Sequence, residues 1–184
     1  MAAAQAIPPA SPDMAGDAGT LDGNTVRRFI LRFAIFSLML ALVPLIPGWD
    51  GVVSRYLSAV AVLVNGLLHL LGQQTQLDGT NVFCSAFHRA IEPHCSALDI
   101  VLFYSATVLA FPAAAMRKTV GLLAGFTAIA TLNIIRITTV YLTGIRWPAN
   151  VPGVHEKLWP VLLIMATVAL CAAWVCYARK GRAA

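Results

Sequence analysis

Charged side chains are scarce in this sequence of 184 residues. Only 11% of the residues are charged, whereas 59% are hydrophobic and the mean hydropathy is +0.76. A soluble domain of this length carries about 25% charged residues, because its core must be covered by a hydrated surface. The composition therefore disfavours a soluble globular enzyme.

Several other signals are absent. The 10 Pro and 13 Gly are dispersed, which argues against a collagen-like or low-complexity chain. The net charge of +5 forms no basic patch, because most Lys and Arg residues stand singly or in pairs at the ends of apolar runs. No phosphate loop or dinucleotide fingerprint occurs, so no cofactor is expected. Four unevenly spaced cysteines are too few for a disulfide framework: Cys84, Cys95, Cys171 and Cys176.

Long apolar runs are what the sequence does contain. Crossing about 30 Å of hydrocarbon takes roughly 20 apolar residues in a helix. Four runs meet this length: Phe29–Pro47, Leu98–Met116, Val120–Gly144 and Leu158–Tyr177. A fifth run, Val52–Leu71, is long enough but contains polar side chains, among them Arg55, Asn65 and His69. We therefore expect an all-α polytopic membrane protein with four to five transmembrane helices.

The basic residues predict the orientation, because Lys and Arg near helix ends favour the cytoplasmic side. Three clusters occur: Arg27/Arg28/Arg32, Arg117/Lys118 and Arg179/Lys180/Arg182. Placing all three inside requires an odd number of crossings before residue 73, so Val52–Leu71 is assigned as a helix at the outer interface. Five full spans with the N-terminal arginines outside is the alternative. Residues 1–26 are predicted to be a disordered cytoplasmic tail, 27–178 the membrane domain and 179–184 a basic cytoplasmic tail.

In this topology the segment 73–97 lies outside the membrane. Asp78-Gly79 is a turn signal between short strand-like stretches, which predicts a small hairpin leading into a helix. Cys95 stands at the start of that membrane helix, where unpaired N–H groups and the positive end of the helix dipole favour the thiolate. The thiolate is the nucleophilic form of cysteine.

Two further polar groups belong to the same side of the membrane. Asn133 and Arg136 are three residues apart and share a helix face, and an arginine within a span costs about 2.5–3.5 kcal/mol unless it meets a polar partner. His155 lies just before the last helix. A snorkelling arginine and an interfacial histidine are the simpler alternatives. Asp99 is one turn below Cys95, where it either pairs with Arg136 or contacts the helix start.

Cys95, Arg136 and His155 come from three separate segments but map to one face of the membrane. A thiol, a guanidinium and an imidazole are the nucleophile, oxyanion stabiliser and proton shuttle that acyl transfer requires. The outer segments therefore predict an acyl-transfer site.

Three blocks in this order resemble the exosortase/archaeosortase family of membrane transpeptidases: Cys95-Ser96-Ala97, Asn133-Ile134-Ile135-Arg136-Ile137 and His155-Glu156. The resemblance covers roughly residues 30–178. The short length and two further patterns look most like the exosortase H subgroup: Phe111-Pro112-Ala113 and His155-x-x-Leu158-Trp159.

The resemblance implies a membrane-embedded cysteine transpeptidase or peptidase in the bacterial plasma (inner) membrane, with its site on the extracytoplasmic face. Its substrates would be exported proteins with a short C-terminal sorting motif, a transmembrane helix and a basic tail. By resemblance Cys95 is the nucleophile, Arg136 stabilises the oxyanion, His155 is the general acid and base, and Asn133 is supporting. The family usually has glycine two residues after the cysteine. Here that residue is Ala97, which fits if its φ is negative.

Other interpretations of the same residues remain open. A metal site could use Cys84, His88, His94 and Cys95, and an oxidising compartment would allow a Cys84–Cys95 disulfide. Cys84 could also be the nucleophile with His88 as its base. A non-catalytic membrane scaffold is the remaining alternative, and it should tolerate loss of Cys95. The tryptophans near the two faces suit aromatic belts: Trp49, Trp147 and Trp159 outside, and Trp174 inside.

Overall fold

The computed structural model describes residues 23–84, 88–91 and 96–180. The helices are α1 (Gly23–Ala41), η2 (Val43–Leu45), α2 (Trp49–Leu70), α3 (Leu98–Ala110), α4 (Ala115–Arg146), η4 (Pro148–Asn150), η5 (Gly153–Leu158) and α5 (Trp159–Lys180). Within the described residues, four helical stretches are long and apolar enough to cross a membrane: Gly23–Leu45, Trp49–Leu70, Ala115–Arg146 and Pro148–Lys180. This confirms the expected helical membrane fold. Helix α1 begins inside the expected N-terminal tail, and α5 ends inside the expected C-terminal tail.

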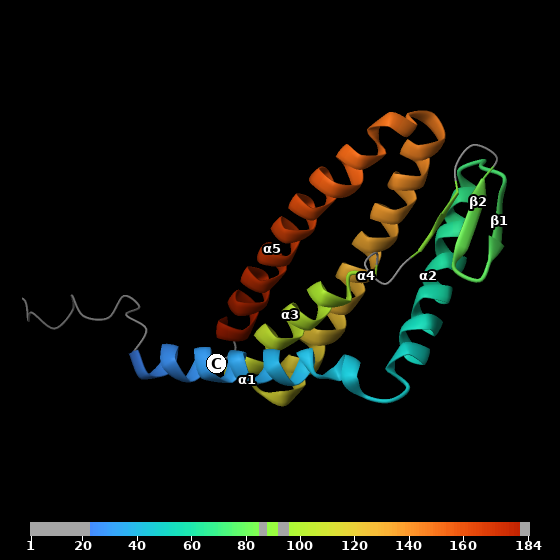
Figure 1. The fold of residues 1–184 in the computed structure, drawn as a ribbon. Coiled ribbons are helices and arrows are strands. Elements are labelled where there is room, and N and C mark those ends of the chain that lie inside the picture. Colours follow the sequence, from blue (N-terminus) through green and yellow to red (C-terminus); the bar gives the residue numbers. More distant parts are fainter. Residues whose placement is uncertain (1–22, 85–87, 92–95, 181–184) are drawn as a thin grey trace, which may run out of the picture.

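Helix α4 is the centre of the fold (Figure 1). Helices α4 and α5 run antiparallel, α3 packs beside the lower half of α4, and α2 stands on the other side of α4. Helix α1 lies across the lower end of this bundle and contacts α3. Aromatic rings fill that contact, since the Phe33 ring meets the Phe103 ring edge-on at 5.7 Å between centroids.

Helix α3 is shorter than the expected run Leu98–Met116. It has 13 residues and ends at Ala110. Pro112 explains the end, because a proline forces the preceding residue out of the helical region, and Phe111 is indeed extended with ψ 135°. At 1.5 Å per residue, α3 reaches about 20 Å, which falls short of the hydrocarbon thickness. Residues 111–114 are not helical, and only Ala115 and Met116 of the expected run belong to α4, which is 32 residues long.

Two basic residues at the start of α4 donate hydrogen bonds to backbone carbonyls at the C-terminal ends of neighbouring helices. The Lys118 ammonium donates to the Leu109 carbonyl at 2.7 Å, near the end of α3. The Arg117 guanidinium donates to the Ala178 carbonyl at 3.5 Å, near the end of α5. Terminal carbonyls lack partners within their own helix and carry the negative end of its dipole, so both contacts stabilise these ends.

The predicted hairpin is present and has a third strand. Strands β1 (Thr75–Asp78), β2 (Asn81–Cys84) and β3 (His88–Ala90) form an antiparallel sheet in the order β1-β2-β3. Gly79 supplies the positive φ of 60° that the first turn needs. Val82 packs fully buried against the apolar face of α2, and the Thr75 hydroxyl donates to the Asn65 amide oxygen at 2.6 Å. Asn65 therefore docks the sheet onto α2.

Small residues let α4 approach its neighbours closely. A side chain at Gly121 would meet the Trp174 ring of α5, and one at Gly125 would overlap the Tyr104 ring of α3. The two glycines are four residues apart and lie on one face of the helix, an arrangement typical of close helix packing in membranes.

Candidate functional site

Asn133 and Arg136 lie on α4, one turn apart. Asn133 is completely buried and Arg136 is 8% exposed. The expected shared polar face is therefore directed into the protein. A side chain that snorkels into the solvent would be far more exposed.

Arg136 and His155 are brought together. The Arg136 Nη2 atom lies 3.4 Å from His155 Nε2, across the junction of α4 and η5. Because a guanidinium only donates hydrogen bonds, Nε2 is the acceptor. The imidazole then carries its proton on Nδ1 and is neutral when this contact is made.

The turn that carries His155 differs from the expected loop Ile145–Lys157. The connection is helical: η4 is followed by η5, a π-helical turn over Gly153–Leu158 that continues into α5. A π turn is wider than an α turn and changes the direction of its side chains, and such turns are common at functional sites. Half-buried His155 therefore lies within a helical turn rather than in an irregular loop.

A hydrogen-bonded chain also joins α5 to the backbone of Arg136. The Trp159 indole donates to the Thr139 hydroxyl at 2.9 Å, and that hydroxyl donates to the Arg136 carbonyl at 2.8 Å. Trp159 is 8% exposed and packs with Val140 and Leu163. It therefore has a structural place between α4 and α5, which differs from the lipid-facing belt expected of it.

Tyr56 of α2 reaches the same region, although the sequence pattern does not predict it as a site residue. Its hydroxyl donates to the Ser96 carbonyl at 3.1 Å and is also hydrogen-bonded to the Asn133 side chain. A tyrosine within an apolar span was the available signal, since a buried hydroxyl needs a partner.

The remaining predicted residues have mixed outcomes. Cys95 lies outside the described residues, but Ser96, bonded to it in the chain, is 3% exposed. Asp99 is exposed on the first turn of α3 and lines an apolar pocket with α5 residues Ile164 and Thr167. Within residues 23–84, 88–91 and 96–180, no ion pair joins Asp99 to Arg136.

The backbone at Ala97 corrects one expectation. Its φ is 54° and its ψ is 20°, which is left-handed, whereas a negative φ is expected for an alanine there. Only glycine adopts this region without a steric penalty. The local turn therefore has the shape that the family glycine would favour.

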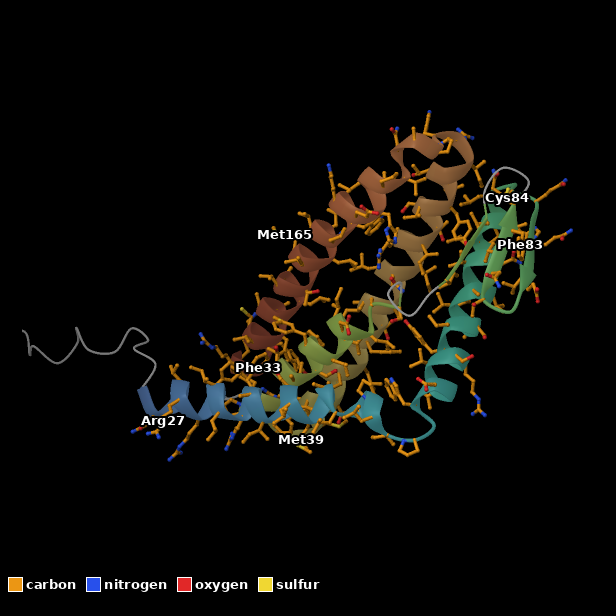
Figure 2. All side chains as sticks on the ribbon, in the orientation of Figure 1. Arg27, Phe33, Met39, Phe83, Cys84 and Met165 are labelled. Carbon is orange, nitrogen blue, oxygen red and sulfur yellow. The ribbon has the colours of Figure 1, made fainter. Side chains whose placement is uncertain are left out.

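The structure describes only some of the residues of the alternative disulfide, nucleophile and metal sites. Among the described residues the Cys84 thiol is free, and Cys95, the other half of the alternative disulfide, lies outside them. Cys84 lies in the sheet beside α2, apart from the junction of α4 and α5 (Figure 2). Among the described residues no group of three potential metal ligands occurs. His94, Cys95 and the His88 side chain, which the metal hypothesis needs, lie outside that part.

Comparison with known proteins identifies the family. No curated protein and no solved structure matches the chain. The family profile described as transmembrane exosortase (Exosortase_EpsH) matches residues 20–173, which include α1 to α4, the sheet, and most of α5. The match agrees with the resemblance seen in the cysteine, arginine and histidine blocks. The chain therefore belongs to the transmembrane exosortase family.

Proposed function

We propose that this protein is a membrane-embedded cysteine transpeptidase or peptidase that cleaves the C-terminal sorting signal of exported surface proteins. Membership of the transmembrane exosortase family supports a sorting peptidase. The observation that carries the mechanism is the 3.4 Å approach of Arg136 to His155, because it pairs an oxyanion donor with a proton carrier. Ser96, the neighbour of Cys95 in the chain, is linked through Tyr56 to Asn133, one turn from Arg136.

In the first half-reaction His155 takes the thiol proton of Cys95 at Nε2. The thiolate attacks the carbonyl carbon of the scissile peptide bond, and the carbonyl electron pair moves onto oxygen. Protonation of Nε2 removes the acceptor of the Arg136 contact, so the guanidinium becomes available to the oxyanion. The carbon–nitrogen bond then breaks, His155 protonates the leaving amine, and Cys95 holds the acyl group as a thioester.

In the second half-reaction an amine, a sugar hydroxyl or water adds to the thioester carbon. His155 takes the proton of this nucleophile, and the second tetrahedral oxyanion again meets Arg136. Collapse expels the Cys95 thiolate, and return of the proton from His155 to that thiolate completes the cycle. Water gives a peptidase, whereas the other two acceptors give a transpeptidase.

The proposed site faces the extracytoplasmic side of a bacterial plasma membrane. Arg117 and Lys118 lie at the opposite end of α4 from Arg136 and His155, close to the end of α5. Basic residues favour the cytoplasmic side, so the other end faces outward. The proposed partners are proteins anchored by a C-terminal transmembrane helix, which carry a short sorting motif before that helix and a basic tail after it.

The test follows the size of a C-terminally anchored candidate surface protein co-expressed with this chain. We expect Cys95→Ala to abolish its shortening and Cys84→Ala to leave it intact. Cys84→Ala is the matched control because this free thiol belongs to the sheet. Normal shortening with both variants would make the protein a scaffold. Loss with both would favour a Cys84–Cys95 disulfide or a shared metal.

A further inference from the structure

Tyr56 makes a long-range contact beside the proposed nucleophile. It stands on α2, and its hydroxyl donates to the Ser96 carbonyl 40 residues away at 3.1 Å. Ser96 also contacts the first residue of α3, because the Leu98 amide donates to its side-chain oxygen at 3.3 Å. The Tyr56 contact therefore acts on the short backbone between Cys95 and the first turn of α3.

The same phenol oxygen meets Asn133 of α4. A hydroxyl has one proton, and the Ser96 carbonyl accepts that proton, so the Asn133 amide is the donor to Tyr56. Asn133 is completely buried, where hydrogen-bond geometry is strict because no solvent replaces a displaced partner. One oxygen atom thus joins α2, the backbone after Cys95 and α4.

We propose that Tyr56 is a positioning residue, which sets the backbone after Cys95 at a fixed place relative to the Asn133–Arg136 face of α4. This inference rests on the proposed function, since it assigns Tyr56 to the same site. The left-handed backbone at Ala97 supports it, because a turn of unfavourable conformation needs contacts that hold it. Helix α2 then becomes part of the catalytic machinery, although Arg136 and His155 lie on α4 and η5.

Tyr104 provides a matched control for Tyr56. Its hydroxyl also donates to a backbone carbonyl at 3.1 Å, that of Gly121, and also joins two helices. This contact ties α3 to the opening part of α4, at the end of α4 opposite Arg136. The substitutions Tyr56→Phe and Tyr104→Phe each remove one oxygen and keep the ring. Tyr56→Phe loses the contacts with Ser96 and Asn133, whereas Tyr104→Phe loses the contact with Gly121 far from them.

The experiment compares both variants with the wild type in the full-length protein. Cleavage of the anchored substrate is measured first. The alkylation rate of Cys95 by iodoacetamide is then followed against pH, in a background with serine at the other three cysteine positions. Thermal unfolding in detergent is the third measurement. We expect Tyr56→Phe to reduce the cleavage rate by about tenfold to 10²-fold and to change the alkylation profile, with Tyr104→Phe near the wild type.

The outcomes separate this proposal from the proposed function. If Tyr56→Phe alters Cys95 alkylation and melts like Tyr104→Phe, the positioning role stands. If both variants share one alkylation profile, or Tyr56→Phe only lowers the melting temperature or yields no folded protein, the role is structural and the proposal is overturned. If the wild type does not cleave the substrate but the alkylation profiles differ, the proposed reaction fails while the placement of Cys95 by Tyr56 is retained.

Discussion

At the scale of single residues, the burial of Arg136 requires a chemical reason. The side chain is 8% exposed inside an apolar bundle, and its known contact, His155, is itself a polar group. An arginine used only to anchor a helix would extend to an interface along its own aliphatic stem. Arg136 instead contacts the His155 imidazole, and this contact supports its proposed role as the oxyanion donor.

The substitution Arg136→Lys should lower substrate cleavage by about 10²–10³-fold while the protein stays folded. Lysine keeps the charge but replaces a planar group with five donors by a compact ammonium, so it cannot reproduce the geometry in which the guanidinium contacts neutral His155 and then meets the oxyanion. The control is Arg146→Lys, at the exposed end of the same helix, which should cleave normally. Near-normal cleavage by Arg136→Lys would refute the oxyanion assignment.

The left-handed backbone at Ala97 leads to a prediction of increased stability. Ala97→Gly should raise the melting temperature by about 2–4 °C, because relieving the steric penalty is worth about 1 kcal/mol. Ala106→Gly, inside α3, should lower stability by at least about 1 kcal/mol, since glycine disfavours a helix interior. Thermal unfolding of both variants in one detergent tests this contrast. A loss of stability in Ala97→Gly would contradict it.

The polar residues of the site were predictable to different degrees. The spacing of Asn133 and Arg136 alone indicates a shared face, because a helix repeats every 3.6 residues. Tyr56 and Trp159 were not found as site residues, because each has an apolar body and a single polar atom whose partner is distant in sequence. The φ of Ala97 could not be inferred from the identity of the residue, which predicts the opposite sign.

At the scale of the elements, packing of α3 against α4 depends on one missing side chain. Gly125→Ala should destabilise the protein by about 1–3 kcal/mol, because its methyl group would overlap the Tyr104 ring. Gly66→Ala on α2 is the control, since nothing lies near that position and alanine favours the helix by up to about 1 kcal/mol. Melting temperatures should therefore move in opposite directions. Equal shifts would show that the α3–α4 contact tolerates a wider separation.

Element type was easier to predict than element length. The apolar runs indicated the helices, and the Asp78-Gly79 turn indicated the hairpin. The length of α3 was overestimated because hydropathy continues past Ala110, whereas the backbone is interrupted by Pro112. The prolines and glycine of residues 145–157 suggested a loop, but they fold into η4 and η5, where Pro148 and Gly153 occupy opening positions.

At the scale of the whole molecule, the basic clusters gather at one end. The first turns of α1 share a pocket with Arg179 of α5, and Arg32 lies near enough to Lys118 for their charges to interact. Both ends of α1 lie at this lower end, whereas α2 rises from it to the sheet (Figure 1). If this end is cytoplasmic, α2 supplies the single crossing before residue 73 and α1 lies along the inner leaflet. The sequence alone suggested the reverse, with the first apolar run crossing the membrane and Val52–Leu71 lying at the outer interface.

Cysteine labelling in intact cells tests the arrangement of α1 and α2. In a background without the native cysteines, a membrane-impermeant maleimide should label Gln76→Cys of the sheet, while Asn24→Cys and Asp50→Cys should react only after permeabilisation. Outside labelling of Asp50→Cys would mean that α1 crosses and α2 rests on the outer interface. Outside labelling of Asn24→Cys would mean five spans. A shielded Gln76→Cys would contradict the outward site itself, because the sheet and the Ser96 contact both lie against α2.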